Sequence, residues 1–91
     1  MSKSRKSRFR RHFKWRLHFR FHLKSQIVQE VEAILMQRLF INKLHILKET
    51  EDTVKIWYPE LHKKCILIFD KKENVFVTAY KKRKLKIEKN G

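Results

Sequence analysis

The feature that most constrains the fold is the stretch of residues 13–24, where apolar and cationic side chains alternate without interruption. Its apolar members are Phe13, Trp15, Leu17, Phe19, Phe21 and Leu23. Every residue between them is Lys, Arg or His, and residues 1–24 contain no acid. A period of two with this many aromatic residues is typical of a strand. An aromatic face behind a cationic face is also suited to binding nucleic acid.

The same stretch can instead form a helix, and a different set of residues then lines up. At about 3.6 residues per turn, His12, Arg16, Arg20 and Lys24 form one row at i, i+4 spacing. The apolar side chains then spread around most of the circumference, which is unfavourable for an amphipathic helix. Periodicity alone favours a strand, so residues 9–23 stay open between helix and strand.

The net charge of the chain is far from zero. There are 24 Lys and Arg residues against 9 Asp and Glu residues, a formal net charge of +15. The excess lies in residues 1–24 and 53–91, which flank a slightly acidic middle. Self-repulsion at this charge opposes compaction, so we expect the cations to serve a polyanion, which is RNA, DNA or an anionic membrane.

The lengths of the apolar runs and the cysteine content indicate where in the cell the protein is expected. No apolar run approaches the ~20 residues of a membrane-spanning helix, so we expect no membrane partner. The first residues lack the apolar stretch of a secretory signal. Cys65 is the single cysteine and cannot form an internal disulfide. A reducing, cytoplasmic location therefore fits the sequence.

The rest of the chain indicates an α+β fold. We expect a disordered basic arm over residues 1–8 and one small domain over residues 9–91. Residues 25–41 have helical apolar spacing, with Ser25 as the N-cap and Asn42 at the end.

Beyond the helix, the period changes to two. Strands are expected over residues 54–58, 65–69 and 75–80, with a turn at 70–74 and a short edge strand around Leu85 and Ile87. We therefore predict one or two N-terminal helices packed on a three- to four-stranded antiparallel meander.

The residue types limit the chemistry. There is no glycine-rich phosphate loop and no Ser-His-Asp set, and the His and Cys spacings do not support a metal site, so we expect no metal and no cofactor. Basic residues, imidazoles, aromatics and hydroxyls remain. These suffice for metal-free cleavage of RNA, in which the 2′-OH attacks the adjacent phosphate.

Two motifs carry a family resemblance. Residues 12–21 have the form His-x-x-x-Arg-x-x-x-Arg-Phe, followed by the expected helix. Residues 66–80 give a strand, an Asp-Lys turn and a strand ending Thr-Ala-Tyr. This pattern resembles the small RelE-like ribonucleases of the barnase–EndoU–colicin–RelE superfamily, which occur in toxin systems and phages. The resemblance covers residues 9–84, although no strand is evident before the first helix, where the family has one.

The resemblance implies roles for five residues. His12 would transfer the proton, Arg16 and Arg20 would clamp phosphate, and Thr78 or Tyr80 would contact the scissile nucleotide. It also implies a helix around His12. If residues 13–23 form the first strand instead, the row of His12, Arg16 and Arg20 does not exist and this assignment fails.

The predicted function is RNA binding, with a metal-independent endoribonuclease favoured. The alternatives are a non-enzymatic nucleic-acid- or ribosome-binding protein, including a phage-encoded inhibitor of a host machine, and, ranked last, a membrane-active cationic segment. Expected partners are RNA, on the ribosome or free, and an acidic antitoxin or host protein. The candidate nucleic-acid-binding residues are Arg5, Lys6, Arg8, Arg10, Arg11, Lys14, His18, Lys81, Lys82, Arg83 and Lys84.

Overall fold

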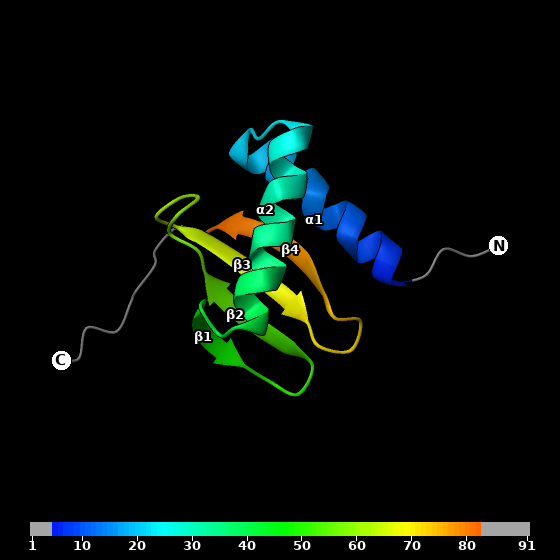
Figure 1. Cartoon of the computed structure of the whole chain (residues 1–91), viewed down its shortest axis with the longest axis vertical. Coiled ribbons are helices and arrows are strands. Elements are labelled where there is room, and N and C mark those ends of the chain that lie inside the picture. The colour runs from blue at the N-terminus through cyan, green and yellow to red at the C-terminus, as the bar shows by residue number, and fades with distance from the viewer. Residues whose placement is uncertain (1–4, 83–91) are drawn as a thin grey trace.

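Two helices precede a four-stranded antiparallel sheet in the computed structural model, which describes residues 5–82 (Figure 1). The helices are α1, Arg5–Phe21, and α2, Ser25–Phe40. The strands are β1, His45–Glu49; β2, Thr53–Trp57; β3, Cys65–Asp70; and β4, Val75–Lys81. The predicted α+β class, with N-terminal helices on an antiparallel meander, is confirmed.

The sheet has one face turned toward the helices. Its strands pair in chain order, and Leu67 of β3 lies between Ile56 and Ala79 of its neighbours. These three side chains belong to the core cluster that α1 and α2 complete. Successive residues of a strand point to opposite faces, so Ile66 and its partner Tyr80 lie on the other face of the sheet. Figure 1 shows α2 lying over the sheet.

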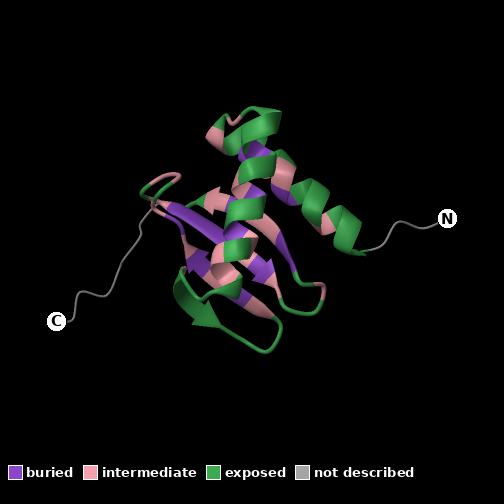
Figure 2. Ribbon diagram, in the orientation of Figure 1, coloured by how far each residue is buried: buried purple, intermediate pink, exposed green. Residues whose placement is uncertain are grey.

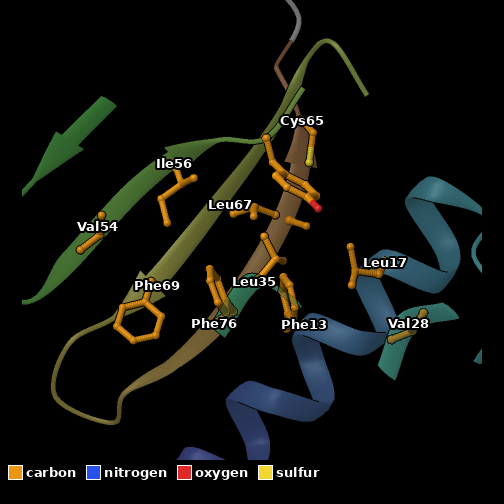
Figure 3. Close-up of a cluster of buried hydrophobic side chains, with 12 residues drawn as sticks. Phe13, Leu17, Val28, Leu35, Val54, Ile56, Cys65, Leu67, Phe69 and Phe76 are labelled. Atoms are coloured by element: carbon orange, nitrogen blue, oxygen red, sulfur yellow. The ribbon is translucent and has the colours of Figure 1, made fainter. Parts of the chain in front are cut away.

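The core is built from both helices and the three strands β2 to β4. Phe13 and Leu17 of α1 and Leu35 of α2 are fully buried among sheet residues (Figure 3). The Phe13 ring stacks on Phe76 of β4, with centroids 5.3 Å apart. Burying each of these large side chains contributes about 1.5–3 kcal/mol. Since α1 supplies two of them, it is an integral part of the domain.

Residues 9–21 are helical, so the strand that periodicity favours is wrong. Only Phe13 and Leu17, which are one turn apart, are buried within α1. Trp15 and Phe19 carry the same period-of-two pattern and remain exposed. Packing against β4 selects the i, i+4 pair, and tertiary contact of this kind overrides a local pattern.

Three further expectations need correction. Residues 5–8 form the first turn of α1, where we expected a disordered arm, and residues 1–4 lie outside the described part. Ser25 is already inside α2, and the extended N-cap is Lys24, with no side-chain cap. Strand β1 was not predicted. The expected edge strand at residues 85–87 also lies outside the described part.

Asparagine lies at two expected reversals of the chain, the end of α2 and the turn between β3 and β4. Asn42 ends α2 with φ 60°, and its N–H donates to the Leu39 carbonyl at 3.2 Å. The N–H of Lys43 donates to the Arg38 carbonyl at 2.8 Å, which completes a Schellman cap. Asn74, also at φ 60°, closes the turn between β3 and β4. Within residues 5–82, no helix is long and apolar enough to span a bilayer.

Candidate nucleic-acid interface

Three members of the expected helical row, His12, Arg16 and Arg20, lie on α1, whereas Lys24 follows the end of that helix and is the N-cap of α2. Arg16 Nε donates a hydrogen bond to His12 Nε2 at 3.1 Å. Because Arg16 remains charged, this bond requires a neutral imidazole with its proton on Nδ1. Partial burial lowers the pKa of His12 from its ordinary value of 6.5, and the positive charges of Arg16 and Arg20 lower it further. The row therefore holds an uncharged imidazole beside two guanidinium groups at neutral pH.

Thr78 and Tyr80 lie on β4, the strand that packs along α1. They pair with Ile68 and Ile66, so both are on the sheet face opposite the core, and both are half-buried. Among residues 5–82, no hydrogen bond, ion pair or ring contact joins either of them to His12. The structure thus assembles the helical part of the predicted catalytic set, and leaves the two strand residues separate from it.

An exposed aromatic pair occupies the outer side of α1. Trp15 is 48% exposed and Phe19 is 56% exposed, and their ring centroids lie 4.6 Å apart. The guanidinium carbon of Arg16 lies 5.2 Å from the centroid of the Trp15 ring, and the His12 ring stacks on the same indole at 6.3 Å. Aromatic rings set among cations on an open surface are the elements of a base-stacking platform.

Trp15 and Phe19 were missing from the predicted site residues. The alternating pattern puts every aromatic residue on one face, where a core position is the simplest interpretation. On a helical projection, Trp15 and Phe19 lie opposite Phe13 and Leu17. The opposite positions of the two pairs could have indicated that Trp15 and Phe19 are exposed, but only once residues 9–21 are taken as a helix.

Two of the predicted nucleic-acid-binding cations bind within the protein. Arg10 donates to Glu32 of α2 from Nη2 at 3.1 Å and from Nε at 3.3 Å, and the Lys14 ammonium lies 3.7 Å from the same carboxylate. Glu32 is only 8% exposed. Its carboxylate raises the pKa of Arg10 through the hydrogen bonds and its charge. Arg10 and Lys14 therefore hold α2 against α1.

The other α1 cations apart from the half-buried Arg16 are exposed, and Figure 2 shows the first half of the helix as mostly exposed. Arg5, Lys6, Arg8 and Arg11 have no ion-pair partner among the described residues, and α1 contains no acidic residue. Three acids elsewhere, Glu49, Asp52 and Glu60, pair with cations outside α1. The positive charge of the domain is thus least compensated on the outer side of α1.

Of the remaining predicted nucleic-acid-binding residues, three make contacts within the protein and two lie outside the described residues. The His18 imidazole donates from Nδ1 to the Leu23 carbonyl at 2.7 Å, so it braces the end of α1. Lys81 lies over the Phe21 ring, with Nζ 5.4 Å from the centroid, and the Lys82 N–H donates to the Lys64 carbonyl. Arg83 and Lys84 lie outside the described residues.

A hollow of about 330 Å³ lies beside Trp15 in the groove between α1 and α2. Arg11, Trp15 and His18 line it from α1, and Val28 and Gln29 line it from α2. In the described part of the chain, no group of three or more His, Cys, Asp or Glu side chains is placed to hold a metal ion. The chemistry available at this surface is stacking, hydrogen bonding and charge.

Comparisons with known proteins give no relative. No protein-family model, no curated protein and no solved structure matches the chain. The resemblance to RelE-like ribonucleases therefore depends on the short motifs quoted above, and the function has to be argued from the geometry.

Proposed function

We propose that this chain binds single-stranded RNA through the outer side of α1. The observation that supports this best is the exposed pair of Trp15 and Phe19 on a helix whose outer cations have no acidic partner among the described residues. Stacking on such rings contributes about 1–3 kcal/mol per base, and Arg and Lys side chains neutralise the phosphates.

A single strand suits this surface better than a duplex. Bases can stack on Trp15 only when they are free of their own helix, as they are in loops and at ends. The hollow beside Trp15, with cationic Arg11 at its rim, gives such a base room. An A-form duplex would meet the cations and leave the rings unused.

Anisotropy titrations with labelled single-stranded and duplex RNA test the binding proposal. Trp15→Ala should weaken single-strand binding by about tenfold, the order expected for one lost stacking contact. Phe40→Ala is the matched control, because Phe40 is 91% exposed but lies at the far end of α2. Equal affinities for Trp15→Ala and the wild type would overturn the stacking role.

The second candidate is the metal-free endoribonuclease, and the contact between Arg16 and His12 favours it. For His12 to act as the base, Nε2 has to lose its bond from Arg16. A phosphate that draws Arg16 away would free Nε2 to take the 2′-OH proton, while Arg16 and Arg20 neutralise the phosphate. The 2′-oxygen then bonds to phosphorus, the bond from phosphorus to the 5′-oxygen breaks, and the departing 5′-oxygen takes a proton from water. Thr78 and Tyr80 lie on the sheet face opposite the core and, among the described residues, have no hydrogen bond, ion pair or ring contact with this row, so the proposal gives them no role in the step.

Cleavage separates the two candidates. A ribonuclease should cut RNA in EDTA, leave 2′,3′-cyclic phosphate ends, and lose activity without losing affinity in His12→Ala. If several RNAs are bound and remain intact, the enzyme proposal is rejected and the binding proposal stands.

We further propose the cytoplasm as the location, since the buried thiol of Cys65 fits a reducing compartment. The ribosome is an RNA-rich partner there. An acidic antitoxin or host protein would compete with RNA for the outer cations of α1, because both ligands are polyanions. Competition of this kind would appear as RNA release on adding the acidic protein.

A further inference from the structure

A second cleft lies further along the groove between α1 and α2, where the two helices meet the turn between β3 and β4, and it shares Lys14 and Gln29 with the hollow beside Trp15. Its volume is about 480 Å³, and clefts that hold small ligands have about 300–1,000 Å³. Lys6, Arg10 and Lys14, at i, i+4 spacing, line it from α1. The amides of Gln29 and Asn74 line it from α2 and the turn.

The charge of the cleft points to a phosphate at the end of a chain. Glu32 is the one carboxylate among its lining residues, and it takes Arg10 and Lys14 as partners. Lys6 has no ion-pair partner within residues 5–82. Three cations against one carboxylate leave a formal charge of +2. A phosphomonoester, at about −1.5 to −2 near pH 7, matches that charge, whereas an internal phosphodiester carries only one negative charge.

Apolar side chains complete the lining. Ala33, Met36 and Val75 also line the cleft, so it offers an apolar surface for a ring beside its cations. Met36 is adaptable in shape and suits a flat base. We infer that this cleft binds a nucleoside 5′-monophosphate, with the phosphate in the row of Lys6, Arg10 and Lys14. The source is the 5′-phosphorylated end of an RNA strand or a free mononucleotide.

The inference rests on the proposed function only if the nucleoside monophosphate is the 5′ end of an RNA strand. The test therefore has one arm with RNA and one with a free mononucleotide. The first compares one short single-stranded RNA with a 5′-phosphate and the same RNA with a 5′-hydroxyl. The wild type should prefer the phosphorylated strand by about tenfold, because the added group makes charge-assisted hydrogen bonds. Lys6→Ala should abolish the preference and Lys6→Arg should restore it.

Two variants serve as controls in this arm. Arg8→Ala removes an exposed cation of α1 that does not line the cleft, and Trp15→Ala removes the stacking surface. Both should weaken the two strands equally and leave their ratio unchanged. If the wild type binds both strands with equal affinity, the 5′ end of RNA is excluded as the ligand of the cleft while RNA binding stands.

The second arm uses adenosine 5′-monophosphate and inorganic phosphate, followed by amide NMR shifts. Shifts at Gln29, Ala33 and Asn74 that Lys6→Ala removes would support the cleft even if no RNA binds. Shifts with the nucleotide but not with phosphate would show that the apolar wall contributes. If neither the nucleotide nor a phosphorylated strand shifts these amides, the inference is rejected.

Discussion

Arg10 and Glu32 connect α1 to α2 through two hydrogen bonds, from Nη2 at 3.1 Å and from Nε at 3.3 Å. The carboxylate is almost buried, and no other carboxylate lies within ion-pair distance of an α1 cation among residues 5–82. A helix that carries so much positive charge is thus secured by a single acid of its neighbour. Most of the remaining charge faces outward.

Glu32→Gln should lower the free energy of unfolding by about 1–2 kcal/mol, as measured by urea titration. Removing one partner of a largely buried pair is costly, but the half-exposed Arg10 side chain can be solvated, which limits the loss. Glu30→Gln, at an exposed position of the same helix, should change stability by less than about 0.5 kcal/mol. Equal losses in both variants would contradict a special role for Glu32.

Phe13→Ala should destabilise the domain by about 3–5 kcal/mol, because it leaves a cavity beside Phe76. In a domain this small that loss approaches the whole stability, so Phe13→Leu, at about 1 kcal/mol, is the measurable companion. Phe19→Ala should stay within about 0.5 kcal/mol, since that ring is exposed. A strand would bury the two residues alike, so similar losses at both positions would contradict the helix.

Asn42→Ala should lower stability by about 1 kcal/mol, because alanine resists the left-handed conformation that ends α2. Asn42→Gly should retain the wild-type stability, since glycine adopts positive φ freely. Thermal melts of the two variants provide the comparison. A loss in Asn42→Gly as large as in Asn42→Ala would mean that the asparagine side chain matters more than its backbone.

The thiol of Cys65 should be inert in the folded protein. Burial raises its pKa from 9.0 to about 12, so it stays protonated where an unfolded thiol has ionised. The unfolded state therefore releases its proton first, and the free energy of unfolding falls as the pH rises from about 9 to 12. Labelling with a thiolate-specific reagent at pH 8.5 should be slow without urea and fast with it. Equal rates would contradict the burial.

The His12 imidazole should titrate below 6.5 in an NMR experiment, and Arg16→Gln should raise its pKa by removing one nearby charge. The lowered pKa of His12 also makes the stability of the fold depend on pH. Acidification through 6.5 protonates His12 in the unfolded state before the folded state, so it destabilises the fold. An unchanged titration of His12 in Arg16→Gln would contradict the contact.

Strand β2 could be predicted because it buries alternate residues, which is what a period of two indicates. Strand β3 could be predicted because it is apolar from Cys65 to Phe69 and mostly buried, and β4 because it follows the turn at 70–74. Strand β1 could not, since all five of its residues are exposed and its pairing comes only from β2. The failure at residues 9–21 has another cause. Period and burial disagree there, because Trp15 and Phe19 share the pattern of Phe13 without sharing its environment.

The candidate site also has a part that local sequence spacing predicts and a part that depends on packing. The row of His12, Arg16 and Arg20 could be proposed from spacing, since i, i+4 geometry needs only a helix. The exposure of Trp15 depends on which side of that helix meets β4, and no local pattern contains that information. The pairing of Arg10 with Glu32 likewise needs the angle between two helices. Long-range packing decides which cations remain for a ligand.

The short connection between α1 and α2 affects how fast a ligand can associate with the groove between these helices. Only residues 22–24 join the helices, His22 sits at φ 56°, and the bond from His18 to the Leu23 carbonyl closes the link. The backbone of the groove is therefore held in place, so the protein's share of the entropy lost on binding comes from its exposed side chains. A flexible strand should associate at a rate set by diffusion and charge, without a slow rearrangement of the protein.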